Sequence, residues 1–336
     1  MSAPRLRFAP TPSRPLHAGS ALAALLGWGA ARARGGAFVL RVEDIDRQRC
    51  RPEHEASCLE DLAWLGLDWD EGPDVGGAHG PYRQSERLDR YDHALASLEA
   101  RGVAYRCHCS RADVLAAQSA PHLPPRRRVA PDAVEPGEWP YPGTCRPRDG
   151  ASALSGGRAR FHVEGLGEDA RVTWRDGDGR AYTEDVRTTC GDFVLGREGE
   201  PSYQLAVVVD DIAMGITDVV RGADLLGSTA RQILLHRALG VTPPSFSHHP
   251  LLVDADGRKL SKRDGDLAIA ELRRAGVAPG ALCATLGRAV GLFGAAVLEA
   301  TPRDVADALA ARAPGDALHD GVLAACDLDA LGGRDA

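Results

Sequence analysis

Leu6-Arg7-Phe8-Ala9 and Phe38-Val39-Leu40-Arg41-Val42 decide the predicted fold, because both runs are typical of strands and a helical pattern separates them. Leucines recur at helical spacing between the two runs, so we predict a helix over residues 17–34. A strand, a helix and a strand within about 37 residues match the size of one βαβ unit. Such a unit pairs its strands in parallel and binds ligands beyond their carboxyl ends.

The carboxyl ends of these two strands carry polar and proline-rich stretches. Ala9-Pro10-Thr11-Pro12-Ser13 follows the first strand, and Glu43-Asp44-Ile45-Asp46 follows the second. The nearly continuous apolar run of the second strand favours a sheet that is covered on both faces. The pattern therefore predicts an α/β fold with a ligand site at this edge of the sheet.

Periodicity in the rest of the chain predicts an α/β domain that is split by an insertion. Helical patterns at 52–65 and 85–101 continue the first half, and short strands with turn sequences follow them. The apolar run Tyr203 to Val209 fits a strand or a buried helix equally well, whereas 228–239 predicts a helix with Ser228 as its N-cap. The predicted regions are the first half of a Rossmann-type domain at 1–102, the insertion at 103–200, the second half at 201–264 and a C-terminal helical region at 265–336.

Composition bounds the class of protein. The chain has 336 residues, 44% of them hydrophobic, and a net charge of −7, which argues against a general basic coat for nucleic acid but leaves a local basic face open. Eight scattered cysteines in so long a chain do not suggest a secreted disulfide framework. The first residues lack the apolar core of a signal peptide, and the apolar run over 21–31 is too short to span a bilayer. We expect a cytoplasmic protein and a monomer.

Lys259-Leu260-Ser261-Lys262-Arg263 holds both lysines of the chain, although the chain has 40 basic residues. A lysine is a compact charge on a flexible stem, which suits a group that must follow a phosphate through a reaction. A solvated turn is the alternative, because the preceding Asp254-Ala255-Asp256-Gly257 is turn-forming.

His17-Ala18-Gly19-Ser20 opens the first predicted helix. The free N–H groups and the positive dipole end of a helix start suit a phosphate. Gly19 would let a nucleotide approach the backbone, and His17 could donate a hydrogen bond to a phosphate oxygen. An ordinary capped helix with a surface histidine would show the same four residues.

Five segments together resemble the class I aminoacyl-tRNA synthetases of the glutamyl type. Residues 7–13 with Leu16-His17-Ala18-Gly19-Ser20 resemble the signature known as HIGH, and residues 259–263 resemble KMSKS. Because all the matches keep one order, they are far more specific together than any one alone. The resemblance implies a class I catalytic domain with an inserted subdomain that resembles an acceptor-binding one. The other three matching segments are Arg41 to Asp46, Tyr203 to Asp211 and Val220 to Leu226.

Cysteines of the predicted insertion suggest a metal site. The pattern Cys-x-Cys at 107–109 and Tyr-x-x-x-Cys at 141–145 offers three thiolates and a fourth ligand to Zn²⁺, which prefers four tetrahedral ligands. From spacing alone, three cysteines that bind no metal are an alternative, and His108 and His122 are more usual fourth ligands than Tyr141. The pattern resembles the zinc site of glutamyl-queuosine tRNA(Asp) synthetases, truncated relatives of the glutamyl-tRNA synthetases. The ligands that this resemblance implies for one structural zinc ion are Cys107, Cys109, Tyr141 and Cys145.

The length after the second signature favours the truncated relatives. Only 73 residues follow Arg263, which leaves room for a few helices but not for the large anticodon-binding region of a glutamyl-tRNA synthetase. The resemblance then implies that L-glutamate and ATP form glutamyl-adenylate without tRNA, and that the glutamyl group passes to the queuosine base in the anticodon of tRNA(Asp). The alternatives are a synthetase-like enzyme that charges a tRNA 3′ end and a synthetase-like binding protein without catalysis.

The resemblance also implies roles for single residues. Because arginine binds carboxylates in a bidentate geometry, Arg7 and Arg221 would hold the carboxylates of glutamate, and Glu43 would hold its ammonium group. ATP would arrive with Mg²⁺, and the catalytic residues would be His17, Gly19 and Lys262. The implied ATP-binding residues are His17, Gly19, Ser20, Lys259, Ser261 and Lys262. The implied glutamate-binding residues are Arg7, Phe8, Ala9, Pro10, Thr11, Glu43, Tyr203 and Arg221.

Two features fall outside the common pattern. Arg14 stands where the family usually has glycine, and an arginine adopts a positive φ only at a cost, so the geometry of this loop and the entry of ATP come into question. Arg126-Arg127-Arg128 lies in a proline-rich stretch and could contact tRNA phosphates. A solvated loop is an equally good interpretation of that run.

Overall fold

The structure is a computed structural model that describes residues 3–110, 112–114, 141–147, 156–253, 268–312, 318 and 321–322. Several residues singled out from the sequence lie outside these ranges. They are His122, Arg126 to Arg128, Lys259, Ser261 and Lys262.

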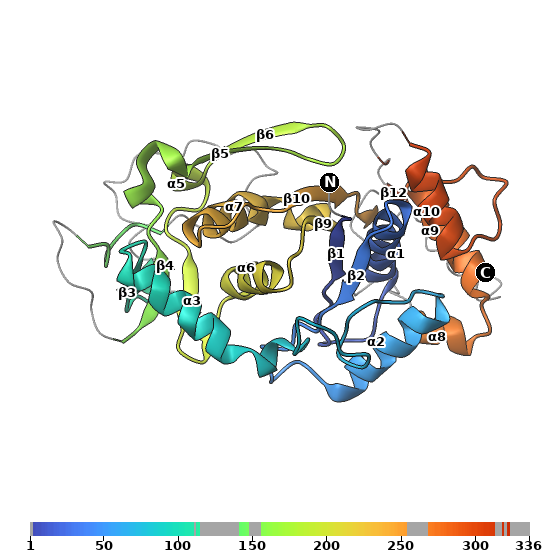
Figure 1. Ribbon diagram of the computed structural model, residues 1–336, viewed down its shortest axis with the longest axis horizontal. Coiled ribbons are helices and arrows are strands. Elements are labelled where there is room, and N and C mark those ends of the chain that lie inside the picture. The colour runs from blue at the N-terminus through green and yellow to red at the C-terminus, as the bar shows by residue number, and fades with distance from the viewer. Residues whose placement is uncertain are drawn as a thin grey trace.

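The predicted βαβ unit is confirmed. Strands β1 (Arg5–Phe8) and β2 (Ala37–Leu40) pair in parallel, and helix α1 (Ala18–Ala33) connects them (Figure 1). Strand β2 ends before Val42, the predicted last residue, because the backbone N–H of Val42 donates to the carbonyl oxygen of Tyr82 at 2.8 Å. The loops after both strands thus start at one edge of the sheet, as the sequence predicts.

A second parallel pair lies beside the first. Strands β9 (Asp218–Gly222) and β10 (Ser245–His249) pair in parallel, and helix α7 (Thr229–Ala238) lies between them in the sequence. The backbone N–H of Thr217 donates to the carbonyl oxygen of Arg5 at 2.9 Å, which joins the start of β9 to β1. The two halves of the α/β domain therefore meet although Arg5 and Thr217 are 212 positions apart in sequence.

Helix α6 (Tyr203–Ala213) decides between the two interpretations of the apolar run. Ser202 caps its start by accepting the backbone N–H of Leu205 at 3.3 Å. All residues from Leu205 to Asp211 are buried. A helix that is enclosed on every side needs apolar residues on every face, and its sequence then shows no helical period.

Ser228 occupies the N-cap position of α7, as the sequence predicts, but it does so without a side-chain cap. Its side chain makes no capping hydrogen bond to α7, because its hydroxyl accepts hydrogen bonds from Gln204 at 3.0 Å and from Arg231 at 3.2 Å. A 3-10 helix, η3 (Ala223–Ser228), leads directly into α7 and replaces the extended residue that a cap requires.

Three helices near the C-terminus pack against the first half of the α/β domain. Helices α9 (Pro279–Ala289) and α10 (Pro302–Ala310) lie against α1, and α8 (Ile269–Arg274) lies against α2 (Pro52–Trp64) (Figure 1). One hydrophobic core includes buried leucines of α1, α2, α8 and α9. The helical pattern predicted after residue 265 is confirmed over these three helices.

The strands between residues 104 and 201 pair among themselves. Strands β3 (Ala104–Cys107), β4 (Arg158–Phe161), β7 (Val194–Arg197) and β8 (Glu200–Pro201) form one antiparallel sheet in the order β3-β4-β7-β8. Strands β5 (Arg171–Arg175) and β6 (Ala181–Asp185) form a separate hairpin. Helix α3 (Leu88–Ala100) precedes this region. The four-region division with boundaries at 102, 200 and 264 stays a prediction.

Shorter elements complete the described chain, and none of its described helices is long and apolar enough to cross a membrane. These elements are η1 (Gln84–Glu86), η2 (Glu164–Ala170), α5 (Val186–Thr189), β11 (Leu252–Val253) and β12 (Gly321–Val322).

Candidate active site

The start of α1 has the features that the sequence predicts for a phosphate site. His17 is the N-cap, and its Nδ1 accepts the backbone N–H of Ser20 at 3.3 Å. A Cβ atom on residue 19 would lie 3.2 Å from Cε1 of His17, so any side chain larger than that of Gly19 would crowd the imidazole. Gly19 therefore leaves room for the imidazole of His17 directly over the helix start, where a phosphate would approach the backbone N–H groups.

The first described residue after the segment that carries the lysines lies beside this helix start. Residues 254–267 lie outside the described residues, but the next residue, Ala268, forms an isolated antiparallel bridge with His17. The backbone N–H of Ile269 also donates to the carbonyl oxygen of Leu16 at 2.9 Å. The structure thus brings Ala268 and Ile269, which follow the second signature in sequence, to the first signature.

Arg221, at the end of β9, is a buried cation with neutral partners. Its side chain is 4% exposed, and it donates to His248 at 3.0 Å, to Gln232 at 2.6 Å and to Thr229 at 2.8 Å. No carboxylate among the described residues lies within ion-pair distance of it. Burial is the largest influence on its ionisation and lowers the pKa of Arg221 to about 10. A buried guanidinium without a counter-ion is well suited to bind an anionic ligand.

The other predicted glutamate residues lie close to Arg221. Burial, and then the charge of Glu43, raises the pKa of Tyr203, while Arg221 and Arg7 lower it. Tyr203 as a whole is 38% exposed, so this burial concerns its hydroxyl group among the charged residues and not the entire side chain. Arg7 is buried and donates to Asp211 at 3.2 Å. The structure therefore gathers two arginines, a carboxylate and a phenol from four separate elements.

The strand-end segment from Phe8 to Thr11 is less uniform. The side chain of Phe8 is buried in the core with α1, so only its backbone could serve a ligand. The carbonyl oxygen of Pro10 accepts the backbone N–H of Glu43 at 2.9 Å, which holds the loops after β1 and β2 together. Ala9 is half-buried and Thr11 is exposed.

A buried ion network includes Glu43 and Arg7, and sequence reasoning assigned no role to most of its other members. Arg41 is fully buried and pairs with Glu43 at 3.2 Å and with Asp211 at 2.7 Å. Asp210 lies 3.7 Å from Arg41 and also accepts from Arg87 at 2.6 Å. Burial lowers the pKa of Arg41, but these three carboxylates outweigh it and raise that pKa. The network fixes Glu43 and, through Asp211, Arg7.

The two other acidic residues after β2 have structural partners. Asp44 accepts hydrogen bonds from the backbone and hydroxyl of Ser85 at 2.8 and 2.6 Å. Asp46 pairs with the exposed Arg49 at 2.5 Å. Of the acidic residues in this segment, Glu43 is therefore the one that joins the buried network around Arg41.

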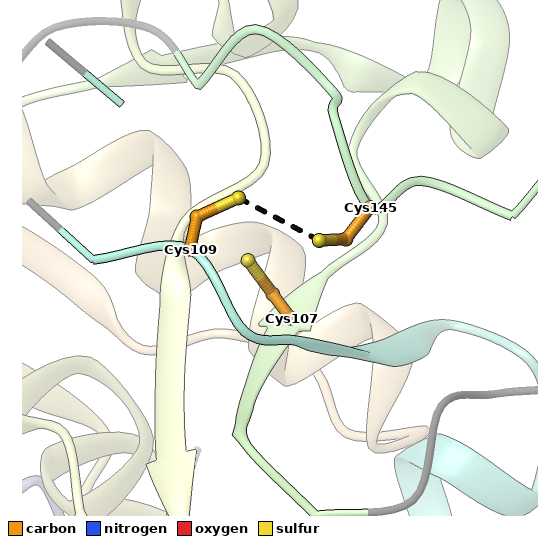
Figure 2. Close-up of side chains that lie close together, drawn as sticks. All are labelled: Cys107, Cys109 and Cys145. Carbon is orange, nitrogen blue, oxygen red and sulfur yellow. Dashed lines mark hydrogen bonds between the residues drawn. The ribbon is translucent and has the colours of Figure 1, made fainter. Parts of the chain in front are cut away.

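The three cysteines of the insertion form a cluster that could hold a metal ion (Figure 2). The sulfur atoms of Cys107, Cys109 and Cys145 all lie within 4.8 Å of one another. The hydroxyl oxygen of Tyr141 lies 3.4 Å from the sulfur of Cys107 and 3.5 Å from that of Cys109. Three soft thiolates and one oxygen fit the tetrahedral donor set of Zn²⁺.

Groups around the cluster favour the thiolate form of Cys145. Burial opposes ionisation of Cys145, but hydrogen bonds from the backbone of His108 and from Tyr141 outweigh burial and lower its pKa. Asp192 braces the cluster by accepting from Tyr105 at 2.6 Å and from Arg146 at 2.8 Å. His108 is exposed and does not belong to the cluster, so Tyr141 is the better placed fourth group.

Of the other cysteines, Cys58 and Cys283 are buried in the core, as expected of packing residues. Burial raises the pKa of each thiol to about 12.

Comparison with known sequences identifies the family. Residues 4–126 and 181–297 match the family described as tRNA synthetases class I (E and Q), catalytic domain. The chain is 50% identical over 281 residues to the glutamyl-Q tRNA(Asp) synthetase of Symbiobacterium thermophilum, covering 81% of this chain and 82% of the relative. It is 46% identical to the enzyme of the same name from Nitratidesulfovibrio vulgaris, with the same two shares.

The chain belongs to the glutamyl-Q tRNA(Asp) synthetase family. The α/β class I fold and the ligase class that the sequence predicts are therefore confirmed. The glutamate–tRNA ligase of Thermosynechococcus vestitus is 42% identical over 81% of this chain, but the match covers only 54% of that relative.

Solved structures agree with this family. The crystal structure of a glutamate tRNA ligase from Elizabethkingia meningosepticum, in complex with its amino acid, matches 98% of this chain and 69% of its own with a TM-score of 0.78 at 27% identity. The structure of glutamate-tRNA synthetase from Elizabethkingia anophelis matches with a TM-score of 0.75 at the same identity.

Proposed function

We propose that this protein activates L-glutamate with ATP, without tRNA, and transfers the glutamyl group to the queuosine base in the anticodon of tRNA(Asp). Its place in the glutamyl-Q tRNA(Asp) synthetase family supports this reaction. The observation that carries the glutamate part is Arg221, a buried cation for which the described residues supply no counter-ion. Binding of a substrate carboxylate would supply that missing charge.

The charges of the pocket complement those of glutamate. Glutamate carries two carboxylates and one ammonium group, and the pocket offers Arg221, Arg7 and Glu43. Arg221 and Arg7 would each bind one carboxylate, Glu43 would bind the ammonium group, and the Tyr203 hydroxyl would add a hydrogen bond at the open side. Arg7 already forms an ion pair with Asp211, whereas Arg221 has no carboxylate partner among the described residues. Arg221 would therefore contribute more to binding.

Activation needs placed charge around the α-phosphorus of ATP as a glutamate carboxylate oxygen attacks it. His17, Gly19 and Ser20 would bind the phosphates on one side. The bridge between His17 and Ala268 supports the proposal that Lys259, Ser261 and Lys262 approach from the other side. Mg²⁺ would accompany ATP and neutralise part of its charge.

Two assays test this function. Glutamate-dependent exchange of pyrophosphate into ATP, measured without tRNA, reports the first step. Labelled glutamate should then appear on queuosine-containing tRNA(Asp), including molecules whose 3′-terminal nucleotide has been removed, but not on tRNA(Asp) that lacks queuosine. Label on tRNA(Glu) would instead support charging of a 3′ end, and the absence of any exchange would support a binding protein.

Replacement of Lys262 by arginine should lower the exchange rate by about tenfold to a hundredfold. The charge is kept, but a flat guanidinium cannot follow the phosphates as a compact ammonium group does. Exchange kinetics at saturating glutamate measure this, with Arg263→Lys as the control that alters the neighbouring charge. Full activity of the Lys262→Arg variant would contradict the role given to this lysine.

We also propose that the cysteine cluster binds one structural zinc ion through Cys107, Cys109, Cys145 and Tyr141. When bound, zinc would tie β3 to the segment around Tyr141 and would take no part in the chemistry at the pocket. The Cys107→Ser variant should lose most of its zinc and melt at a lower temperature, because structural zinc contributes folding free energy. Metal analysis of the purified protein measures this.

Cys50→Ser is the matched control, because Cys50 is half-buried and lies outside the cluster. It should keep one zinc ion per chain. Stoichiometric zinc in the Cys107→Ser variant would exclude Cys107 as a ligand.

A further inference from the structure

The turn of the β5–β6 hairpin contacts β10 at His248, a residue that is hydrogen-bonded to Arg221. Figure 1 shows this hairpin reaching from the side of α5 across to β10. Asp176, the first residue of the turn, accepts the backbone N–H of His248 on β10 at 2.9 Å. The fit is close, since a Cβ atom on Gly177 would lie only 2.0 Å from the hydroxyl oxygen of Ser247. Residues that are 72 positions apart in sequence thus share one contact.

His248 connects Asp176 to Arg221 through its two ring nitrogens. Its Nε2 lies 3.0 Å from Nε of Arg221, and its Nδ1 lies 2.7 Å from a carboxylate oxygen of Asp176. An arginine N–H can only donate, so Nε2 must be the acceptor and Nδ1 must carry the proton. Burial lowers the pKa of His248, which agrees with a neutral ring. The chain of donors therefore runs from Arg221 to His248 and on to Asp176.

This arrangement leaves part of Arg221 available to a ligand. A guanidinium has five N–H groups, and the bonds to His248, Gln232 and Thr229 use three of them. The remaining two are the number that a bidentate carboxylate requires. The imidazole of His248 separates the carboxylate of Asp176 from Arg221. Asp176 therefore does not occupy the position that a substrate carboxylate would take on Arg221.

We propose that Asp176 and His248 are positioning residues for glutamate recognition, which act by fixing the orientation of Arg221. The proposal rests on the proposed function, since it assumes that Arg221 binds a carboxylate of glutamate. It also makes the hairpin tip part of the amino acid site, so that displacement of the hairpin changes glutamate affinity. Gln232 and Thr229 bind the two terminal nitrogens of the guanidinium, whereas the Asp176–His248 pair binds its Nε.

The test is glutamate-dependent ATP–pyrophosphate exchange by the full-length protein, with KM measured separately for glutamate and for ATP. The Asp176→Asn variant keeps the shape of the contact and removes its charge, and it should raise KM for glutamate about tenfold while KM for ATP stays unchanged. Asp178→Asn in the same turn is the control, because Asp178 pairs with Arg180 and not with β10. It should leave both KM values unchanged.

Two substitutions of His248 separate its two contacts. In His248→Gln the side-chain oxygen can reach the Nε2 position and accept from Arg221, but the side-chain hydrogen bond to Asp176 is lost and only the backbone one remains. In His248→Asn the amide can still donate to Asp176, but Nε of Arg221 is left without an acceptor. Both should raise KM for glutamate, and the asparagine variant should raise it more, because it leaves a buried donor unsatisfied.

The outcomes distinguish the inference from the function on which it rests. Wild-type protein without glutamate-dependent exchange would overturn both. Active wild type with an unchanged KM for glutamate in Asp176→Asn and His248→Asn would overturn the positioning role alone. A merely structural contact predicts a lower melting temperature and less active protein with the same KM for glutamate, and that result would also overturn it. If Asp176→Asn does not fold, the two His248 variants test the positioning role, because KM for glutamate should be higher in His248→Asn than in His248→Gln.

Discussion

Replacement of Arg221 by methionine is expected to abolish glutamate activation and to leave the free protein about as stable as before. Methionine fills a similar volume and removes a buried charge for which the described residues provide no carboxylate. Exchanging buried charges for apolar groups is often neutral for stability. The three lost hydrogen bonds act in the opposite direction, so the free energy of unfolding should change by no more than about 1 kcal/mol.

The loss of activity should be large. A charged hydrogen-bonded pair between a buried arginine and a substrate carboxylate is worth about 3 kcal/mol or more, which corresponds to a decrease of at least about a hundredfold in kcat/KM for glutamate. Glutamate should also raise the melting temperature of the wild type but not that of the variant, since only a protein that binds the ligand is stabilised by it. Calorimetric melting with and without glutamate measures this independently of ATP.

Arg34→Met is the matched control for this experiment. Arg34 also reaches a residue of β9, but it is 49% exposed and pairs with Asp218 at 2.9 Å. Its loss should leave the exchange rate and the glutamate-dependent melting shift unchanged. A normal melting shift in the Arg221→Met variant would mean that glutamate binds elsewhere.

The sequence predicted the fold best where one face of an element is apolar. Helix α1 has leucines at helical spacing and was found within a few residues of its predicted bounds, and the predicted C-terminal helical region contains α8, α9 and α10. Helix α6 had no period because the residues from Leu205 to Asp211 are all buried. The run is apolar because other elements enclose the helix on every side, and the sequence of the run does not show that enclosure.

The candidate site was predicted where residues follow strand ends or match known signatures. Arg7, Glu43, Tyr203 and Arg221 are close in space, as expected. The partners of these residues could not be predicted, because Asp176 reads as an ordinary turn residue and nothing local connects it to His248. Contacts between distant segments depend on the path of the whole chain, which neither composition nor period encodes.

Replacement of Asp210 by asparagine should destabilise the protein strongly, by about 3–5 kcal/mol. Asp210 is fully buried and receives hydrogen bonds from Arg87, from Gln84 and from the hydroxyl of Tyr91. Asparagine has the same shape but no charge, so it would leave the fully buried Arg41 and Arg87 with less negative charge around them. Removal of one partner from a buried ion pair leaves an uncompensated charge, which has a larger effect than removal of the whole pair.

Denaturant unfolding at neutral pH measures this difference, and Asp46→Asn is its control. Asp46 also pairs with an arginine, but that partner is 76% exposed, so water replaces the lost contact and stability should change by less than about 0.5 kcal/mol. Equal effects of the two substitutions would show that Asp210 is not a central charge of the network. A large effect confined to Asp210→Asn would instead mean that the ions beneath the pocket hold β2 and α6 together. Glu43 and Arg7 would then owe their positions to the same charges that stabilise the fold.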